Sequence, residues 1–338
     1  MQTSAPTAPS RTQPGDYSWV VTMWVVVAAF AVVTAFRSHQ VGIPLRDPSG
    51  SIFRNRIALS LVLFAVFAVV DAAVRIDRRG WNLSRLSQEV RRRWPKDRLI
   101  LGLSGVLAYH LVYACYRNLK SWNAFRHQQD DHLLSLDKAL FAGHSPAVLL
   151  HDLLGEGAAA QILTVIYQSF GYIVPVSFVA ALVFANQIRQ GYVFLSAALW
   201  AWIIGVGTYY LVPAIGPFWS ASKEFAGLDP TKVTRTQAKY MTERADLLAH
   251  PGASDSFASI GAFASLHVGF TCLILLMVRY YGFPRATKVM TVYLILIMIS
   301  TIYLGWHFVV DDAAGLLLAY IAVLFGRLTI YGRRGRPS

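Results

Sequence analysis

The sequence predicts an all-α polytopic membrane protein with about eight transmembrane helices. Of its 338 residues, 55% are hydrophobic and only 14% are charged, a composition far from that of a soluble domain. Several apolar runs reach the length of about 18 residues that marks a candidate transmembrane helix. The two cysteines, Cys115 and Cys272, lie in apolar runs and show no metal-binding spacing and no evident disulfide.

The predicted spans follow the apolar runs in chain order. They cover about residues 18–36, 57–75, 98–116, 160–185, 192–212, 262–281, 286–304 and 308–330. The polar residues 1–16, rich in Pro, Ser and Thr, predict a disordered tail. The first apolar run is longer than a signal-peptide core and lacks a small-residue cleavage site, so we expect an uncleaved span.

The net charge of +13 is concentrated between spans, which argues against a nucleic-acid partner and for an oriented membrane protein. The 76–98 loop is densely basic, and the positive-inside rule therefore places it in the cytoplasm. Alternation then puts both termini inside and the loops 37–56, 117–159 and 213–261 outside. These outer segments, with Asp311 and Asp312, hold equal numbers of basic and acidic residues, so the positive excess lies inside.

The two long outer loops are expected to differ in structure. Residues 117–159 predict one or two short helices lying against the bilayer, whereas the polar 213–261 segment, with its Gly and Pro residues, predicts a functional loop. In the last span, Gly315 is expected to permit close helix packing.

The strongest functional signal is a pair of histidines at the predicted outer face. His307 and Asp311 are four residues apart, a spacing that allows a hydrogen bond on one helix face. His267 lies where the long outer loop enters the sixth span, after Ser265, whose helix start would favour an anion. Ionisable groups at such depth are functional candidates, although a structural polar pair joining two helices is the alternative. Together the residues make a phosphoryl-transfer set.

These residues carry a resemblance to a known family. Residues 264–267, Ala-Ser-Leu-His, are similar to the Pro-Ser-Gly-His block of the type 2 phosphatidic acid phosphatase superfamily. Residues 300–311 are similar to its third block, Ser-Arg, five residues, His, three residues, Asp. The end of the fifth span, residues 209–219, resembles the inositolphosphotransferase branch that contains inositol phosphorylceramide synthase.

The resemblance implies a six-span catalytic core at residues 98–330, preceded by two additional spans with a basic loop at 17–97 and followed by a basic tail at 331–338. It also implies that His307 is the nucleophile that becomes phosphohistidine, Asp311 its orienting partner and His267 the general acid, with Ser265 donating to phosphate oxygens. Thr301 stands where the family has its phosphate-binding arginine, and the family's first block is absent.

Something else must then stabilise the charge on phosphorus. The expected phosphate-binding residues are Ser265, Arg117, Lys120 and Tyr210. For Arg117 and Lys120, anchoring at the membrane interface is an equally good interpretation.

The sequence therefore predicts an enzyme of the bacterial plasma membrane that acts on a lipid-linked phosphate at the extracytoplasmic face. The branch resemblance favours transfer of a phosphoinositol-type head group to a polyol such as inositol. The alternatives are a lipid phosphate or prenyl diphosphate phosphatase, and a non-enzymatic lipid-binding or transport protein. No metal site, no organic cofactor and no obligate protein partner is implied. A proton-coupled carrier is disfavoured, because only His110 lies at mid-membrane depth.

Overall fold

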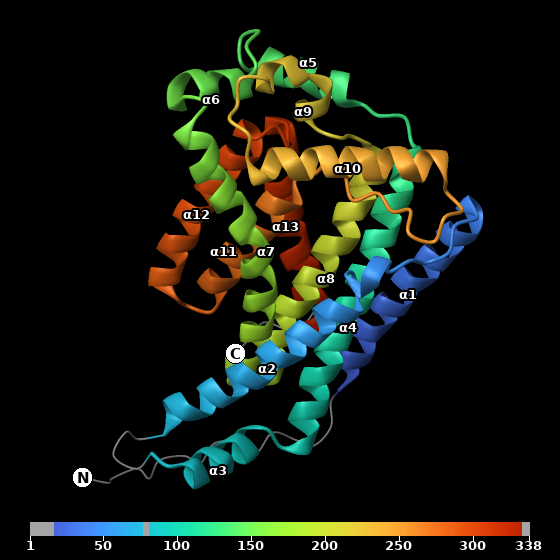
Figure 1. Cartoon of the computed structure of the whole chain (residues 1–338). Helices are drawn as coiled ribbons and strands as arrows, with labels where there is room; N and C mark the ends of the chain where they lie inside the picture. The colour runs from blue at the N-terminus through green and yellow to red at the C-terminus, as the bar shows by residue number, and fades with distance from the viewer. Residues whose placement is uncertain (1–16, 77–80, 333–338) are drawn as a thin grey trace.

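The computed structural model describes residues 17–76 and 81–332, and the described chain is helical without strands (Figure 1). The predicted tail at 1–16 and most of the tail at 331–338 lie outside the described residues. The helices are α1 Ser18–Val41, α2 Arg54–Arg75, α3 Leu83–Arg93, α4 Lys96–Trp122, α5 Asp130–Leu140, α6 Pro146–Leu154, α7 Ala158–Phe184, α8 Ile188–Leu211, α9 Pro217–Ser220, α10 Lys232–Ala249, α11 Leu266–Tyr280, α12 Pro284–Tyr303 and α13 Val309–Tyr331.

Within the described ranges, seven helices are long and apolar enough to cross a bilayer, namely α1, α2, α4, α7, α8, α12 and α13. They confirm the predicted polytopic membrane fold. The sixth predicted span, 262–281, is shorter than expected, because α11 begins only at Leu266 and has 15 residues. The residues before it run into the bundle without helical structure, held by hydrogen bonds from Ala262 N to Ala214 O and from Ala264 N to Thr208 Oγ1.

The centre of the bundle is α8. Its most apolar stretch is 72% buried, whereas the corresponding stretches of the other long apolar helices are 22–50% buried. It packs against α4, α7, α11 and α13, while α2 packs against α4 and α7. As a result, α2, α4, α7 and α8 enclose one side of the molecule around a shared interior.

The two ends of the bundle carry different structures (Figure 1). The basic helix α3 lies at one end, and α5, α6, α9 and α10 gather at the other. The short helices expected in 117–159 are present as α5 and α6. The prediction of a loop for 213–261 was incomplete, because α10 forms there across the end of the bundle. Its start is capped by the Thr231 hydroxyl, which accepts from the N–H groups of Val233 and Thr234.

Two buried carboxylates of α5 fix neighbouring chain segments. Asp130 accepts hydrogen bonds from the backbone N–H groups of Ile215 and Gly216, at the turn before α9. Asp137 accepts from Val309 N at 2.7 Å and Val310 N at 3.2 Å, at the start of α13. Free N–H groups at a helix start are satisfied in this way, and their dipole favours a negative charge. The cap helix α5 therefore positions the beginning of α13.

The beginnings of α11 and α13 approach each other closely at Gly315. A Cβ at this position would press against the backbone carbonyl of Ser265 and lie 3.3 Å from Gly269 N. The Ser265 N–H also donates to the Asp311 carbonyl at 3.0 Å. Because backbone atoms cannot yield as a flexible side chain would, glycine is required here.

We therefore expect Gly315→Ala to lower the free energy of unfolding by about 2 kcal/mol, since overpacking a tight contact costs more than the helix propensity of alanine returns. Thermal unfolding of the purified protein in detergent measures this. Gly207→Ala on α8 is the matched control, because a Cβ there meets no atom within 4 Å. If the two variants were equally stable, the close contact would not matter.

Candidate active site

His307 lies in the turn between α12 and α13, and its position is fixed from two sides. The backbone N–H of His307 donates to the carbonyl of Thr301 at 3.3 Å, and the ring Nδ1 lies 3.3 Å from Asp311 Oδ2. The same carboxylate oxygen accepts from Phe308 N at 3.0 Å. The predicted pairing of His307 and Asp311 is thus present in the structure, although it forms at the helix start and not within a continuous helix. Both residues are buried.

Burial lowers the pKa of His307 to about 4. The negative charge of Asp312 opposes this shift, and the positive charge of Lys120 adds to it. The imidazole is therefore neutral near pH 7. A neutral imidazole whose Nδ1 is engaged by a carboxylate keeps a lone pair available on Nε2.

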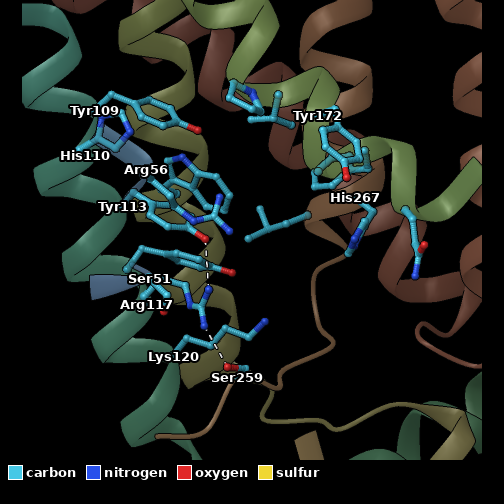
Figure 2. A pocket seen from close by; sticks show the side chains of 18 of the residues that line it. Ser51, Arg56, Tyr109, His110, Tyr113, Arg117, Lys120, Tyr172, Ser259 and His267 are labelled. Atoms are coloured by element: carbon cyan, nitrogen blue, oxygen red, sulfur yellow. Dashed lines mark hydrogen bonds between the residues drawn. The ribbon is translucent and has the colours of Figure 1, made fainter. Parts of the chain in front are cut away.

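His267 lies in the first turn of α11, opposite His307. The two ring centroids are 5.8 Å apart. The His267 ring is held by aromatic contacts, with centroid distances of 4.3 Å to both Tyr167 and Phe170 of α7. Within the described chain its ring nitrogens have no hydrogen-bond partner, and Figure 2 shows the ring at the edge of the cavity. The two predicted catalytic histidines are therefore brought together beside the cavity.

Ser265 and Thr301 lie behind the histidines. The Ser265 hydroxyl accepts from Val268 N at 3.4 Å as the cap of α11, and the side chain is fully buried outside the cavity lining. Thr301, at the position of the family's arginine, donates from Oγ1 to Asp312 Oδ2 at 2.9 Å. Neither side chain brings positive charge to the histidines.

A cavity of about 770 Å³ opens in front of the two histidines. It is lined by residues of α2, α4, α7, α8 and α10, and by the segment that enters α11. Three cationic side chains, Arg56, Arg117 and Lys120, line it, and no carboxylate is among its lining residues. Figure 2 shows these cations along one wall, facing His267. The cavity is thus electropositive and suited to an anion.

Two of the predicted phosphate-binding residues line this cavity. Arg117 donates to Tyr113 Oη at 3.2 Å and to Ser259 Oγ at 2.9 Å. Lys120 has no hydrogen bond or ion pair to any residue the structure describes, and its Nζ lies 5.2 Å from the centroid of the Tyr209 ring. Its ammonium is therefore available to a ligand.

Tyr210 is not brought to the cavity. Its hydroxyl donates to the carbonyl of Leu119 at 2.8 Å, and Arg37 lies 5.5 Å from its ring centroid. Its neighbour Tyr209 lines the cavity instead. Adjacent side chains on a helix point about 100° apart. When Tyr209 faces the cavity, Tyr210 therefore faces a different neighbour.

Sequence reasoning missed the contributions of α2 and of several tyrosines. Arg56 comes from the first turn of α2, and Tyr113 and Tyr116 from α4. The one signal in the sequence is the Arg54-Asn55-Arg56 cluster before the second apolar run, which is equally typical of an interface anchor. In the described chain, no group of three or more His, Cys, Asp or Glu side chains is arranged to hold a metal ion.

Comparisons with known proteins give one family match. Searches of curated proteins and of solved structures gave no match. A family model described as the PAP2 superfamily matches residues 131–325, more than half of the chain. The matched part runs from α5 into α13 and contains His267, His307 and Asp311, whereas α1, α2 and α4 precede it. The chain therefore belongs to the PAP2 superfamily and is a lipid enzyme of the phosphatase or phosphotransferase type.

Proposed function

We propose that this protein transfers the phosphoester group of a lipid-linked phosphate through a phosphohistidine intermediate on His307. The observation that carries the proposal is the pair of imidazoles 5.8 Å apart at an electropositive cavity, one of them bonded to a buried carboxylate. One imidazole can attack phosphorus while the other exchanges protons with the leaving and entering oxygens.

In the first step, His307 Nε2 attacks phosphorus, a P–N bond forms and the P–O bond to the leaving group breaks. The pKa of about 4 keeps the attacking imidazole neutral near pH 7. Asp311 at Nδ1 stabilises the positive charge that develops on the ring. His267 gives its proton to the leaving oxygen. The negative phosphate beside it favours the protonated form of His267.

In the second step, a hydroxyl of the acceptor attacks phosphorus and passes its proton to His267. The P–N bond breaks, and His307 returns to its neutral form. If the acceptor is an alcohol, the enzyme is a transferase, and if it is water, the enzyme is a phosphatase. The residues of the site perform the same chemistry in both cases.

Lys120 takes over the task of the missing arginine in this proposal. Its amino group has no hydrogen-bond or ion-pair partner among the described residues and lies over the Tyr209 ring, and its charge acts on His307 across the cavity. A cation fixed before the reaction in a poorly hydrated cavity stabilises the charge on the phosphoryl oxygens more than it would in water.

A lipid substrate is supported by where the cavity reaches the outside. Leu59 of α2 and Tyr172 of α7 both line the cavity, and their side chains are 53% and 75% exposed. Both belong to long apolar helices. An opening between such helices lets a chain remain in the bilayer while its head group reaches the histidines. The basic helix α3 lies at the opposite end of the bundle, which supports an extracytoplasmic site by the positive-inside rule (Figure 1).

Transfer to a polyol, as in the inositolphosphotransferase branch, is our preferred form of the reaction. The cavity is much larger than a phosphate group, and tyrosine rings line its wall beside the cations. Their hydroxyls and faces suit a ring that carries several hydroxyls. Hydrolysis is the second candidate, since the same cavity also admits water.

The proposal predicts that His307→Ala lowers turnover at least about a thousandfold, because the attacking atom is lost. The assay uses purified protein in lipid nanodiscs with phosphatidic acid, a prenyl phosphate, a prenyl diphosphate and phosphatidylinositol, each with and without free inositol. Released phosphate identifies a phosphatase, and a new lipid formed only with inositol identifies a transferase. His144→Ala, on an exposed histidine outside the cavity, is the control. Unchanged turnover in His307→Ala would exclude this mechanism.

We also expect Lys120→Met to lower kcat/KM about a hundredfold, as loss of a preorganised charge at the transition state does in other enzymes. Methionine keeps most of the apolar stem and removes the amino group, so unfolding in detergent should change little. Lys239→Met, on an exposed lysine of α10 whose partner is Glu243, should retain full activity. Equal activities of the two variants would show that another group stabilises the phosphate.

A further inference from the structure

Two guanidinium groups share one aromatic ring in the cavity. The Arg56 Cζ lies 4.9 Å from the centroid of the Tyr113 ring, and the Arg117 Cζ lies 6.0 Å from it. Neither arginine has an ion-pair partner in the described parts of the chain. Two like charges beside one ring, in a cavity without a lining carboxylate, repel each other until an anion is bound.

This arginine pair is displaced from the reacting groups. Figure 2 shows Arg56, Arg117 and Lys120 in a row along one wall of the cavity. Arg56 and Lys120 stand at opposite ends of this row, with Arg117 between them. Arg117 lies one turn of α4 before Lys120. An anion between the arginines is therefore a different group from the phosphorus that His307 attacks.

The arginine pair is also built to hold its position. Arg117 is fixed by its hydrogen bonds to Tyr113 and Ser259, and its remaining guanidinium N–H groups have no partner in the described part of the chain. Arg56 is exposed and its guanidinium makes no hydrogen bond to a described residue, so its fork can close on a bound anion. Guanidinium groups bind phosphate through paired, charge-assisted hydrogen bonds.

We propose that Arg56 and Arg117, which both contact the Tyr113 ring, form a second anion site that binds a phosphate group other than the one that reacts. The site rests on the proposed function, because it orients a ligand whose other end lies at the histidines. Its phosphate belongs either to a lipid with two linked phosphates or to a phosphorylated acceptor. The site also gives the N-terminal helix α2, which precedes the family match, a role in binding.

The first test measures binding of inorganic pyrophosphate to the full chain in detergent by calorimetry, in a His307→Ala background so that no turnover occurs. Arg56→Gln should weaken binding about tenfold, as expected for loss of one charge-assisted contact. Arg54→Gln is the matched control, because Arg54 is on the same helix turn, is exposed and lies outside the cavity lining. It should change affinity less than twofold. Equal affinities of the two variants would overturn the proposal and leave Arg56 as an interface anchor.

The second test identifies the source of the phosphate. The second measurement uses enzyme that retains His307. Arg56→Gln should raise KM about tenfold for the phosphate-bearing member of one ligand pair and leave its partner unchanged. The pairs are a prenyl diphosphate with the prenyl monophosphate, and inositol phosphate with inositol. A change for the first pair assigns the site to the lipid, and a change for the second assigns it to the acceptor. A KM unchanged for every ligand would overturn the proposal. Pyrophosphate binding without any turnover would instead contradict the proposed reaction and leave the anion site standing.

Discussion

The contact between the beginnings of α11 and α13 determines the chemistry of this protein. Ser265 N–H donates to the Asp311 carbonyl, and the absence of a side chain at Gly315 allows the two backbones to meet. Because His267 is the second residue of α11 and His307 immediately precedes the cap of α13, this contact brings together the two histidines, whose ring centroids are 5.8 Å apart. Asp137 of α5 supports the arrangement from the side by accepting hydrogen bonds from the first N–H groups of α13. The geometry of the site is thus set by backbone packing, which flexible side chains alone would not provide.

The distribution of charge complements this geometry. The carboxyl groups at the site, those of Asp311 and Asp312, are fully buried behind His307 and hydrogen-bonded to Phe308 and Thr301. The positive charges stand on the opposite wall and face the cavity. An anionic group between the two walls would meet cations on one side and imidazoles on the other. In the proposed mechanism, cations on α2 and α4 stabilise the phosphate across the cavity from the histidines.

Much of the fold followed from the sequence, since long apolar runs leave few alternatives to membrane helices. The pairing of His307 with Asp311 followed as well, because a spacing of four residues is a local property. The structure corrected the start of α11 and added α10, whose signal, Thr231 and Thr234 at capping positions, was overlooked within a polar segment. Arg56 reaches the cavity because α2 packs against α4 and α7. Tyr209 lines the cavity, and Tyr210 does not, because of the rotation of α8 about its axis. When a membrane helix is apolar on all sides, its sequence pattern does not show which face turns inward or which helix it packs against.

The central claim is that His307 carries the phosphoester group between donor and acceptor. Rapid quenching of the enzyme during turnover of a phosphorus-labelled lipid, under alkaline conditions that preserve phosphohistidine, followed by peptide mapping, tests this directly. The account predicts label on the peptide that contains His307, lost on acid treatment and absent from His307→Ala. Label on another residue, or turnover without any labelled enzyme intermediate, would contradict it.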